Sequence, residues 1–504
     1  MRVLMLGWEF PPFIAGGLGV ACYGLTRALD AMGHQITFVL PRPVDRNKGT
    51  HVRVLSPEGL SARSAQAAGT PVAAPLGTVG PSAVAEDLGL QSHGFRNTTF
   101  RGVPATFASP YPGHDLANKA TLVDVGDVTL PSPDQVGDAA KDAYAKHVTE
   151  LLSTSRAGGA FPVSSLGGAG GGAGGVSSGL TNGPSNGNYG FDLVGDAERY
   201  ARLVVSLTRG EDYDVIHAHD WLTFPAGVML SRVSGKPLVV HVHSTEFDRA
   251  GNNVNQRVFE IERMGMQSAD RVIAVSQLTK SICERRYGVP ADRIEVVYNG
   301  IEREGQQPSR EAAIQKSDKI VLFLGRITMQ KGPEYFIAAA KRVLEKVPNT
   351  KFVIAGSGDM ALRMVELATN MGIGHKVVFT GFLQGKDVER VFGLADCYVM
   401  PSVSEPFGLA ALEALSHDVP VIVSKTSGVS EVLSHVLKVD FWDIDEMANK
   451  IVAVLRHPPL SNTLREHGAF ELQRLTWTGA AEKCVVAYQS AIGQHDAAGE
   501  LLPA

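Results

Sequence analysis

The stretch that decides the fold is Ile320-Val321-Leu322-Phe323-Leu324-Gly325-Arg326-Ile327-Thr328-Met329-Gln330-Lys331-Gly332. Its first part, Ile320–Leu324, is an unbroken apolar run with the length and composition of a strand buried on both faces. Pro333 follows and suits the first turn of a helix. Arg326 and Lys331 are therefore expected at the carboxyl end of a buried strand, which is where parallel α/β sheets bind ligands.

The same alternation of short apolar runs and helical stretches continues in both directions. It predicts further strands at Val3–Leu6, Ile36–Leu40, Val215–His217, Leu238–His241, Arg271–Val275, Glu295–Tyr298, Lys351–Ala355, Val377–Thr380, Cys397–Met400 and Val419–Val423. Helices are predicted at Leu18–Met32, Leu460–Leu475 and Trp477–Ile492, the last followed by a frayed tail. The predicted fold class is α/β, with two Rossmann-like, doubly wound parallel-sheet domains facing across a cleft.

The predicted domain boundaries follow from this pattern. An N-terminal domain is expected at 1–305, a C-terminal domain at 306–475, and a final helix with a tail at 476–504. A segment rich in Ala, Gly, Ser and Pro, from about 45 to 190, interrupts the first domain, and its core at about 155–190 is predicted to be disordered. Two interpretations of this insertion stay open, a surface segment without function and a mobile flap over a binding site.

Composition excludes several classes of protein. The chain has 504 residues and a formal net charge of −5, so it offers no sign of a polyanion-binding surface and nucleic acid is not an expected partner. Its four cysteines are far apart, which argues against a disulfide framework and favours a reduced, cytoplasmic location. No apolar run approaches the roughly 18 residues of a membrane span, so no integral membrane segment is expected.

Polar clusters follow the predicted strands of the first domain. Gly16–Gly19 opens the first helix, where backbone amides favour an anion, although glycines there could serve packing alone. His217-Ala218-His219-Asp220-Trp221 ends a strand and suits the recognition of sugar hydroxyls and apolar sugar faces. A zinc site is the weaker interpretation, because His-x-His needs further ligands that spacing does not reveal. Alternatively, Asp220 caps the next helix and His217 is a satisfied core residue.

Two further clusters complete the predicted site. His241 and His243 share one face of the next strand, and His243 lies nearer its end, so it is the better catalytic candidate, while His241 is expected to be structural. Glu405 and Glu413 are eight positions apart around the start of a helix, about two turns, and could bond hydroxyls on two parts of one ligand. The alternative is a helix-terminal partner and a solvated side chain. Arg326 and Lys331 can converge on one diphosphate, or form a solvated surface pair.

Taken in order, these motifs resemble the retaining GT-B glycosyltransferases, especially the bacterial glycogen (starch) synthase-like members of group 1. The resemblance rests on Gly16–Gly19, His217–Trp221, His243, Gly325–Gly332, Gly356-Ser357-Gly358 and Glu405 with Glu413, and it covers residues 1–42 and about 192–492. It implies transfer of a hexosyl group, glucose first, from a nucleotide-diphosphate sugar to a carbohydrate acceptor with retention of configuration. ADP- or UDP-glucose is the implied donor, with no cofactor and no metal required. The final helix is implied to cross back to the N-terminal domain.

The resemblance also implies a role for each matching residue. Donor binding falls to Gly17, Leu18, Gly19, Arg326, Lys331, Gly356, Phe382, Glu405, Phe407, Gly408, Leu409 and Glu413. Acceptor binding falls to His219, Asp220 and Trp221. The catalytic group is His243, Asp220, Arg326, Lys331 and Glu405, in which the two cations stabilise the departing diphosphate.

The sequence departs from the family pattern at two places. Ile14 stands where many glycogen synthases have lysine, and Val419 stands where glycine is frequent before the proline of the following strand. The missing lysine weakens the transfer of a glycogen synthase's donor preference. Other activities also stay open, namely another sugar with a small-molecule or lipid-linked acceptor, a sugar-nucleotide epimerase, and a non-catalytic carbohydrate- or nucleotide-binding regulator.

Two other enzyme classes fit the sequence less well. A hydrolase could use Glu405 and Glu413 as its carboxylate pair, but it leaves Arg326 and Lys331 without a purpose. A Rossmann oxidoreductase would need G-x-G-x-x-G directly after the first strand, and that motif is missing there.

Overall fold

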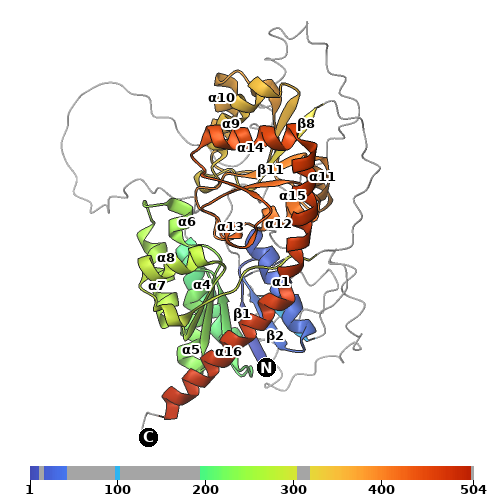
Figure 1. The fold of residues 1–504 in the computed structure, drawn as a ribbon. Helices are drawn as coiled ribbons and strands as arrows, with labels where there is room; N and C mark the ends of the chain where they lie inside the picture. Colours follow the sequence, from blue (N-terminus) through green and yellow to red (C-terminus); the bar gives the residue numbers. More distant parts are fainter. Residues whose placement is uncertain (11–15, 42–96, 103–192, 303–317, 501–504) are drawn as a thin grey trace, which may run out of the picture. The chain divides into compact units, whose positions relative to one another are not determined.

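The computed structural model describes residues 1–10, 16–41, 97–102, 193–302 and 318–500 (Figure 1). The predicted disordered core at 155–190 lies outside these residues, as do residues 303–317 and all of the possible flap except 97–102. Among the described helices, none is long and apolar enough to cross a membrane.

The first sheet has seven parallel strands in the order β3-β2-β1-β4-β5-β6-β7. The strands are β1 Arg2–Leu6, β2 Gln35–Leu40, β3 Thr98–Gly102, β4 Val215–His219, β5 Leu238–Val242, β6 Arg271–Ala274 and β7 Ile294–Val296. Its helices are α1 Gly17–Ala31, α4 Leu193–Leu207, α5 Phe224–Ser234, α6 Glu246–Ala250, α7 Gln256–Ser268 and α8 Gln277–Tyr287, with a 3-10 turn, η5, at Ala291–Arg293. The strand order changes direction at β1, so the connections diverge to opposite faces between β1 and β4. In such sheets ligands bind at that point.

The second sheet has six parallel strands in the order β10-β9-β8-β11-β12-β13. The strands are β8 Lys319–Leu324, β9 Thr350–Ala355, β10 Val377–Gly381, β11 Cys397–Met400, β12 Val421–Ser424 and β13 Leu437–Val439. The helical segments are η7 Met329–Lys331, α9 Pro333–Lys346, α10 Ala361–Asn370, η8 Gly374–Lys376, α11 Lys386–Leu394, α12 Leu409–Ser416, α13 Val429–Val432, α14 Ile444–Arg456, α15 Pro458–Glu471, η9 Leu472–Arg474 and α16 Trp477–Glu500. Two doubly wound parallel sheets confirm the predicted fold class.

Several element bounds differ from the sequence prediction by a few residues, and three elements, β3, β13 and α16, differ more. Strand β3 lies inside the segment predicted to be irregular, because Thr98–Gly102 holds one large apolar residue and gives no periodic signal. Strand β13 has three residues, too few to show a period. Helix α16 was expected to end at Ile492 but continues to Glu500, through a stretch with two adjacent alanines that favours helix.

Helix α16 completes the core of the first sheet, although it follows the second sheet in sequence (Figure 1). Its buried face packs with α1 against the strand face that carries Val215 and Val239. Trp477, at its start, lies so close to Gly24 of α1 that a Cβ there would overlap the indole ring. The opposite strand face, with Ala218 and Leu238, is covered by α5. The final helix therefore closes one side of a sheet that begins at the N-terminus.

The loops after β8 and β9 lie directly against each other. Ile327 donates its amide to the carbonyl oxygen of Ser357 at 2.8 Å. Gly356 has φ +144°, and a Cβ built there would overlap the carbonyl oxygen of Gly325. Only glycine combines this conformation with so close an approach of two backbones. The contact fixes the backbone that carries Arg326.

We expect Gly356→Ala to lower the free energy of unfolding by about 2–4 kcal/mol, because it adds backbone strain and a steric overlap. Gly393→Ala is the matched control, since Gly393 lies in α11 and a Cβ there meets no atom within 4 Å. That variant should be unchanged or more stable by up to about 1 kcal/mol. Urea unfolding followed by circular dichroism measures both, and equal stabilities would contradict the proposed constraint at Gly356.

Candidate active site

Asp220 holds the carboxyl end of β5 in place. It has φ 59°, and its Oδ1 accepts hydrogen bonds from the amides of His243 at 2.7 Å and Ser244 at 3.3 Å. Burial raises the pKa of Asp220 to about 7, against the attraction of Arg249 and of these two amides. Helix α5 instead has Thr223 at its N-cap position. Asp220 thus positions the backbone of residues 243–244 and does not cap the helix that follows it.

His243 and His219 are joined through their rings. Nδ1 of His219 lies 2.9 Å from Nε2 of His243. Burial lowers the pKa of His243 to about 3, so its imidazole is neutral at ordinary pH. His219 and Trp221 are themselves buried, with exposed fractions of 0% and 4%. The structure thus brings His219, Asp220 and His243 together, while the acceptor roles of His219, Asp220 and Trp221 stay predictions.

A charged network that sequence reasoning missed supports this strand end. Arg249 donates to Oε2 of Glu246 at 3.1 Å, to Glu262, and to Oγ of Ser244 at 2.6 Å. Tyr287 donates its hydroxyl to Glu262. Both glutamates are 1% exposed, so their charges depend on Arg249. The sequence pattern nearby, Thr245-x-x-Asp248, marks the start of α6 as a capping box but does not show this network.

Lys331 and Glu405 meet at the carboxyl ends of β8 and β11. Nζ of Lys331 lies 2.5 Å from Oε2 of Glu405, which also accepts from Oγ of Ser402 at 3.1 Å. Arg326 is exposed on the same loop as Lys331, and its Nη2 donates to Oε1 of Gln330 at 3.3 Å. The fold thus brings the predicted cation Lys331 and the predicted sugar-binding carboxylate Glu405 into one ion pair.

The start of α12 lies beside this pair. Gly408 is its N-cap with φ 114°, Phe407 is buried, and Leu409 begins the helix. Glu413 is half-buried inside α12, and burial raises its pKa. Glu405 and Glu413 both raise the pKa of the buried Tyr398, so each carboxylate lies within electrostatic range of its hydroxyl.

The glycine-rich start of α1 and Phe382, also predicted to bind the donor, are among the described residues. Gly17 is exposed, and a Cβ there would meet no atom within 4 Å, so packing does not require glycine at this position. Leu18 is partly buried and Gly19 is buried within the first turn. Phe382, which follows β10, is 37% exposed. The donor roles of these residues stay predictions.

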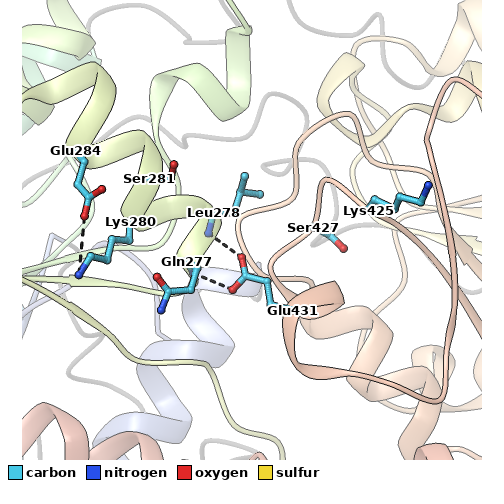
Figure 2. A pocket seen from close by; sticks show the side chains of 8 residues that line it. All are labelled: Gln277, Leu278, Lys280, Ser281, Glu284, Lys425, Ser427 and Glu431. Atoms are coloured by element: carbon cyan, nitrogen blue, oxygen red, sulfur yellow. Dashed lines mark hydrogen bonds and ion pairs between the residues drawn. The ribbon is translucent and has the colours of Figure 1, made fainter. Parts of the chain in front are cut away.

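A pocket on the described surface is lined by other residues, although one of them, Ser427, forms a β-bridge with Glu405 (Figure 2). It is lined by Gln277, Leu278, Lys280, Ser281, Glu284, Lys425, Ser427 and Glu431. The carboxylate of Glu431 accepts the amides of Gln277 at 2.9 Å and Leu278 at 2.7 Å, at the start of α8 (Figure 2). The carboxylate of Glu431 therefore caps the N-terminus of α8, and this is the main polar interaction in the pocket. None of the predicted site residues lines this pocket.

Comparisons with known proteins show which families the chain is similar to. The chain matches three family profiles, described as starch synthase catalytic domain over residues 2–117, Glycosyltransferase Family 4 over residues 152–304, and Glycosyl transferases group 1 over residues 306–469. An uncharacterized glycosyltransferase of Methanocaldococcus jannaschii is 38% identical over 238 residues, which cover 45% of this chain and 61% of that protein. The D-inositol 3-phosphate glycosyltransferase of Mycolicibacterium smegmatis is 30% identical over 308 residues, covering 56% of this chain and 69% of that protein.

Two solved structures share the fold along nearly the whole chain. Sucrose-phosphate synthase from Thermosynechococcus elongatus superposes with a TM-score of 0.62 at 17% identity, covering 98% of this chain and 99% of that one. HepE from Anabaena, solved in complex with UDP and glucose, superposes with a TM-score of 0.60 at 15% identity, covering 97% and 100%. Two doubly wound sheets with charged residues at the carboxyl ends of their strands define a ligand-binding α/β protein of two Rossmann-like domains. The chain belongs to the GT-B glycosyltransferases.

We expect Arg249→Met to lower the free energy of unfolding by about 3–5 kcal/mol, because it leaves two buried carboxylates without their cation. Arg263→Met is the matched control on α7, where Arg263 and its partner Glu260 are 47% and 46% exposed. That exposed pair should contribute at most about 1 kcal/mol. Urea unfolding of the two variants compares the effects, and similar losses would contradict a buried network.

The loss in Arg249→Met should also depend on pH. Burial raises the pKa of Glu262 to about 7, and Arg249 opposes that rise, so removing Arg249 raises it further. A carboxyl with a raised pKa in the folded state destabilises the protein above its unfolded pKa. The variant should therefore lose most stability near pH 8 and regain part of it as the pH falls towards about 5. A loss that is constant across this window would contradict the role of Glu262.

Proposed function

We propose that this chain transfers a hexosyl group, glucose first, from a nucleotide-diphosphate sugar to a carbohydrate acceptor. The observation that carries the proposal is the ion pair of Lys331 with Glu405, 2.5 Å apart, with Arg326 on the same loop. A guanidinium and an ammonium at the carboxyl end of a parallel strand suit a diphosphate, and a buried carboxylate suits sugar hydroxyls. When a donor binds, the diphosphate replaces Glu405 as the partner of Lys331, and Glu405 turns to the sugar.

The leaving group sets the electrostatic requirement. Breaking the anomeric bond places negative charge on the departing diphosphate, and pre-placed cations stabilise that charge as it develops. Arg326 and Lys331 supply two positive charges, and the exposed amide of Gly17 at the start of α1 supplies a further donor. With these groups present, the proposed transfer step needs no metal ion.

Retention of configuration is the proposed stereochemical course. Inversion needs a carboxylate or imidazole free to take the acceptor's proton. Among the described carboxylates near His243, Asp220 accepts two backbone amides, Asp248 is engaged in the capping box at Thr245, and Glu246 is paired with Arg249. Glu9 is also close enough to raise the pKa of Asp220, but it is buried. The departing phosphate is then the base, so the acceptor attacks from the side of the leaving group. His243 is neutral and contacts the donor sugar, with its backbone held by Asp220.

The similar proteins indicate which donors and acceptors to test first. HepE was solved with UDP-glucose, and glycogen synthase of Mycobacterium tuberculosis is 29% identical over 222 residues of this chain. UDP-glucose and ADP-glucose are therefore the first donors to test, in a thermal-shift screen that includes GDP-sugars. A glucan is the first acceptor. A phosphorylated polyol is the second, because the relative with 69% of its length matched is an inositol 3-phosphate glycosyltransferase.

We expect Arg326→Ala and Lys331→Ala each to lower kcat by roughly 100- to 1,000-fold, because each removes one pre-placed partner of the leaving group. The KM for the acceptor should change much less. Arg342→Ala is the matched control, because Arg342 is a 56% exposed cation on α9 of the same domain. Initial rates with the donor chosen by the screen measure all three, and wild-type rates in Arg326→Ala and Lys331→Ala would remove the diphosphate assignment.

The stereochemical prediction is tested on the first product. With an α-linked donor, proton NMR of the early product should show an α-linkage. A β-linkage would show inversion and would require a general base that this proposal does not contain.

A further inference from the structure

Four histidines gather on one face of the first sheet. In a strand, alternate residues share a face, so β4 presents Val215, His217 and His219 on one side, and β5 presents Val239 and His241, with His243 directly after its end. The register pairs His219 with His241. This face is covered by α1 and α16, and its two valines lie in the core that those helices form. Further along both strands, the residues on this buried face are histidines.

Three of these rings are packed without access to solvent. His217 and His219 are 0% exposed, and His241 is 2% exposed. Their ring centroids lie 4.2 Å apart for His217 and His219, and 5.3 Å apart for each of these with His241. One ring nitrogen from each of the three lies within 4.8 Å of the others.

The hydrogen bonds of these rings leave nitrogens unpaired on the side facing the cluster. Nδ1 of His217 lies 2.7 Å from the hydroxyl of Tyr488, and Nδ1 of His219 lies 2.9 Å from Nε2 of His243. Among the described residues, Nε2 of His217, Nε2 of His219 and both nitrogens of His241 have no hydrogen-bond partner. Buried polar atoms without partners cost on the order of 1–3 kcal/mol each, so a group that engages them is expected.

The geometry points to a divalent transition-metal site, with Zn²⁺ as its first candidate, held by His217, His219 and His241. Imidazole is the ligand that such metals share, and three imidazoles from two adjacent strands form a ligand set of the kind that zinc uses. Tyr488 and His243 hold the Nδ1 sides of His217 and His219, which fixes the rings as metal-site neighbours usually do. Zinc–nitrogen bonds of about 2.0–2.1 Å require the three nitrogens, which lie within 4.8 Å of one another, to approach further when the metal binds.

The strand register explains why the sequence alone does not show this ligand set. From sequence, His217 and His219 gave two ligands and too few for zinc. The parallel register adds His241 as the third.

Cys22 offers a competing ligand set. Its sulfur lies within 4.8 Å of ring nitrogens of His219 and His243. However, His219 and His243 already bond to each other through the nitrogens that face one another, and burial raises the pKa of the Cys22 thiol. The three-histidine set needs neither change. A metal there ties β4 to β5 directly beneath Asp220 and His243, and this structural role is independent of the proposed transfer reaction.

The test measures metal in full-length protein without a histidine tag, expressed in defined medium with added zinc and then desalted. Mass spectrometry of the metals should find about one zinc per chain. His241→Phe keeps an aromatic ring of similar size but no ligand, and should hold less than about 0.1 zinc per chain. His375→Phe is the matched control, because His375 is exposed and outside the cluster, and it should keep wild-type zinc.

Cobalt substitution keeps the test decisive even if His241→Phe does not fold. Wild-type protein stripped by a chelator and reloaded with Co²⁺ should show ligand-field absorption in the visible region, and its unfolding midpoint should fall on stripping and return on reloading. Zinc-free wild-type protein with no cobalt spectrum would overturn the site. A thiolate-to-cobalt band that disappears in Cys22→Ser would overturn this ligand set in favour of the one containing Cys22.

Discussion

Parallel pairing of the strands is the constraint on which the rest of this structure depends. In a parallel sheet every strand ends at the same edge, so the loops that follow β4 and β5 meet, as do those that follow β8, β9 and β11. The strand order reverses at β1 and at β8, and at such a point neighbouring connections diverge to opposite faces. Charged residues far apart in sequence, such as Lys331 and Glu405, become neighbours for this reason alone. The chemistry of the site is therefore a consequence of strand order more than of any single loop.

The two sheets hold their strand ends by different physical means. In the second sheet, close backbone contact fixes the loops, and Gly356 can adopt its φ of +144° beside the carbonyl of Gly325 because it has no Cβ. In the first sheet, a buried carboxylate fixes the strand end, because Asp220 accepts hydrogen bonds from two amides at the end of the neighbouring strand. Steric contact is insensitive to charge, whereas the second arrangement depends on the buried cation Arg249 and its two glutamates. The end of β5 is thus sensitive to charge, whereas the contact between the loops after β8 and β9 is not.

Much of the fold could be predicted because its strands are continuous apolar runs with punctuated ends. The apolar composition of Ile320–Leu324 and of Val3–Leu6 predicts buried strands. In contrast, β3 and β13 are short edge strands, and it is the neighbouring strand, not their own residue pattern, that determines their pairing. The candidate site was foreseeable where a motif lies at a strand end, as with Arg326 and Lys331. Arg249 could not be foreseen, because its role comes from Glu262, which lies on another helix. Likewise, the sequence shows His217 and His219 but not that the register places His241 beside them.

In the proposed function, the ion pair of Lys331 with Glu405 keeps the site stable without a donor and still lets it bind one. A buried carboxylate without a cation is costly, so Glu405, 6% exposed, needs Lys331 when no diphosphate is present. Ser402 supplies a second partner to the same oxygen, which lets Glu405 keep a hydrogen bond when Lys331 turns to phosphate. Sugar hydroxyls then replace the ammonium as hydrogen-bond donors to Glu405, while the diphosphate becomes the partner of Lys331. The exchange binds the part of a donor that all nucleotide-diphosphate sugars share, so the selectivity for the base and the acceptor must come from other residues.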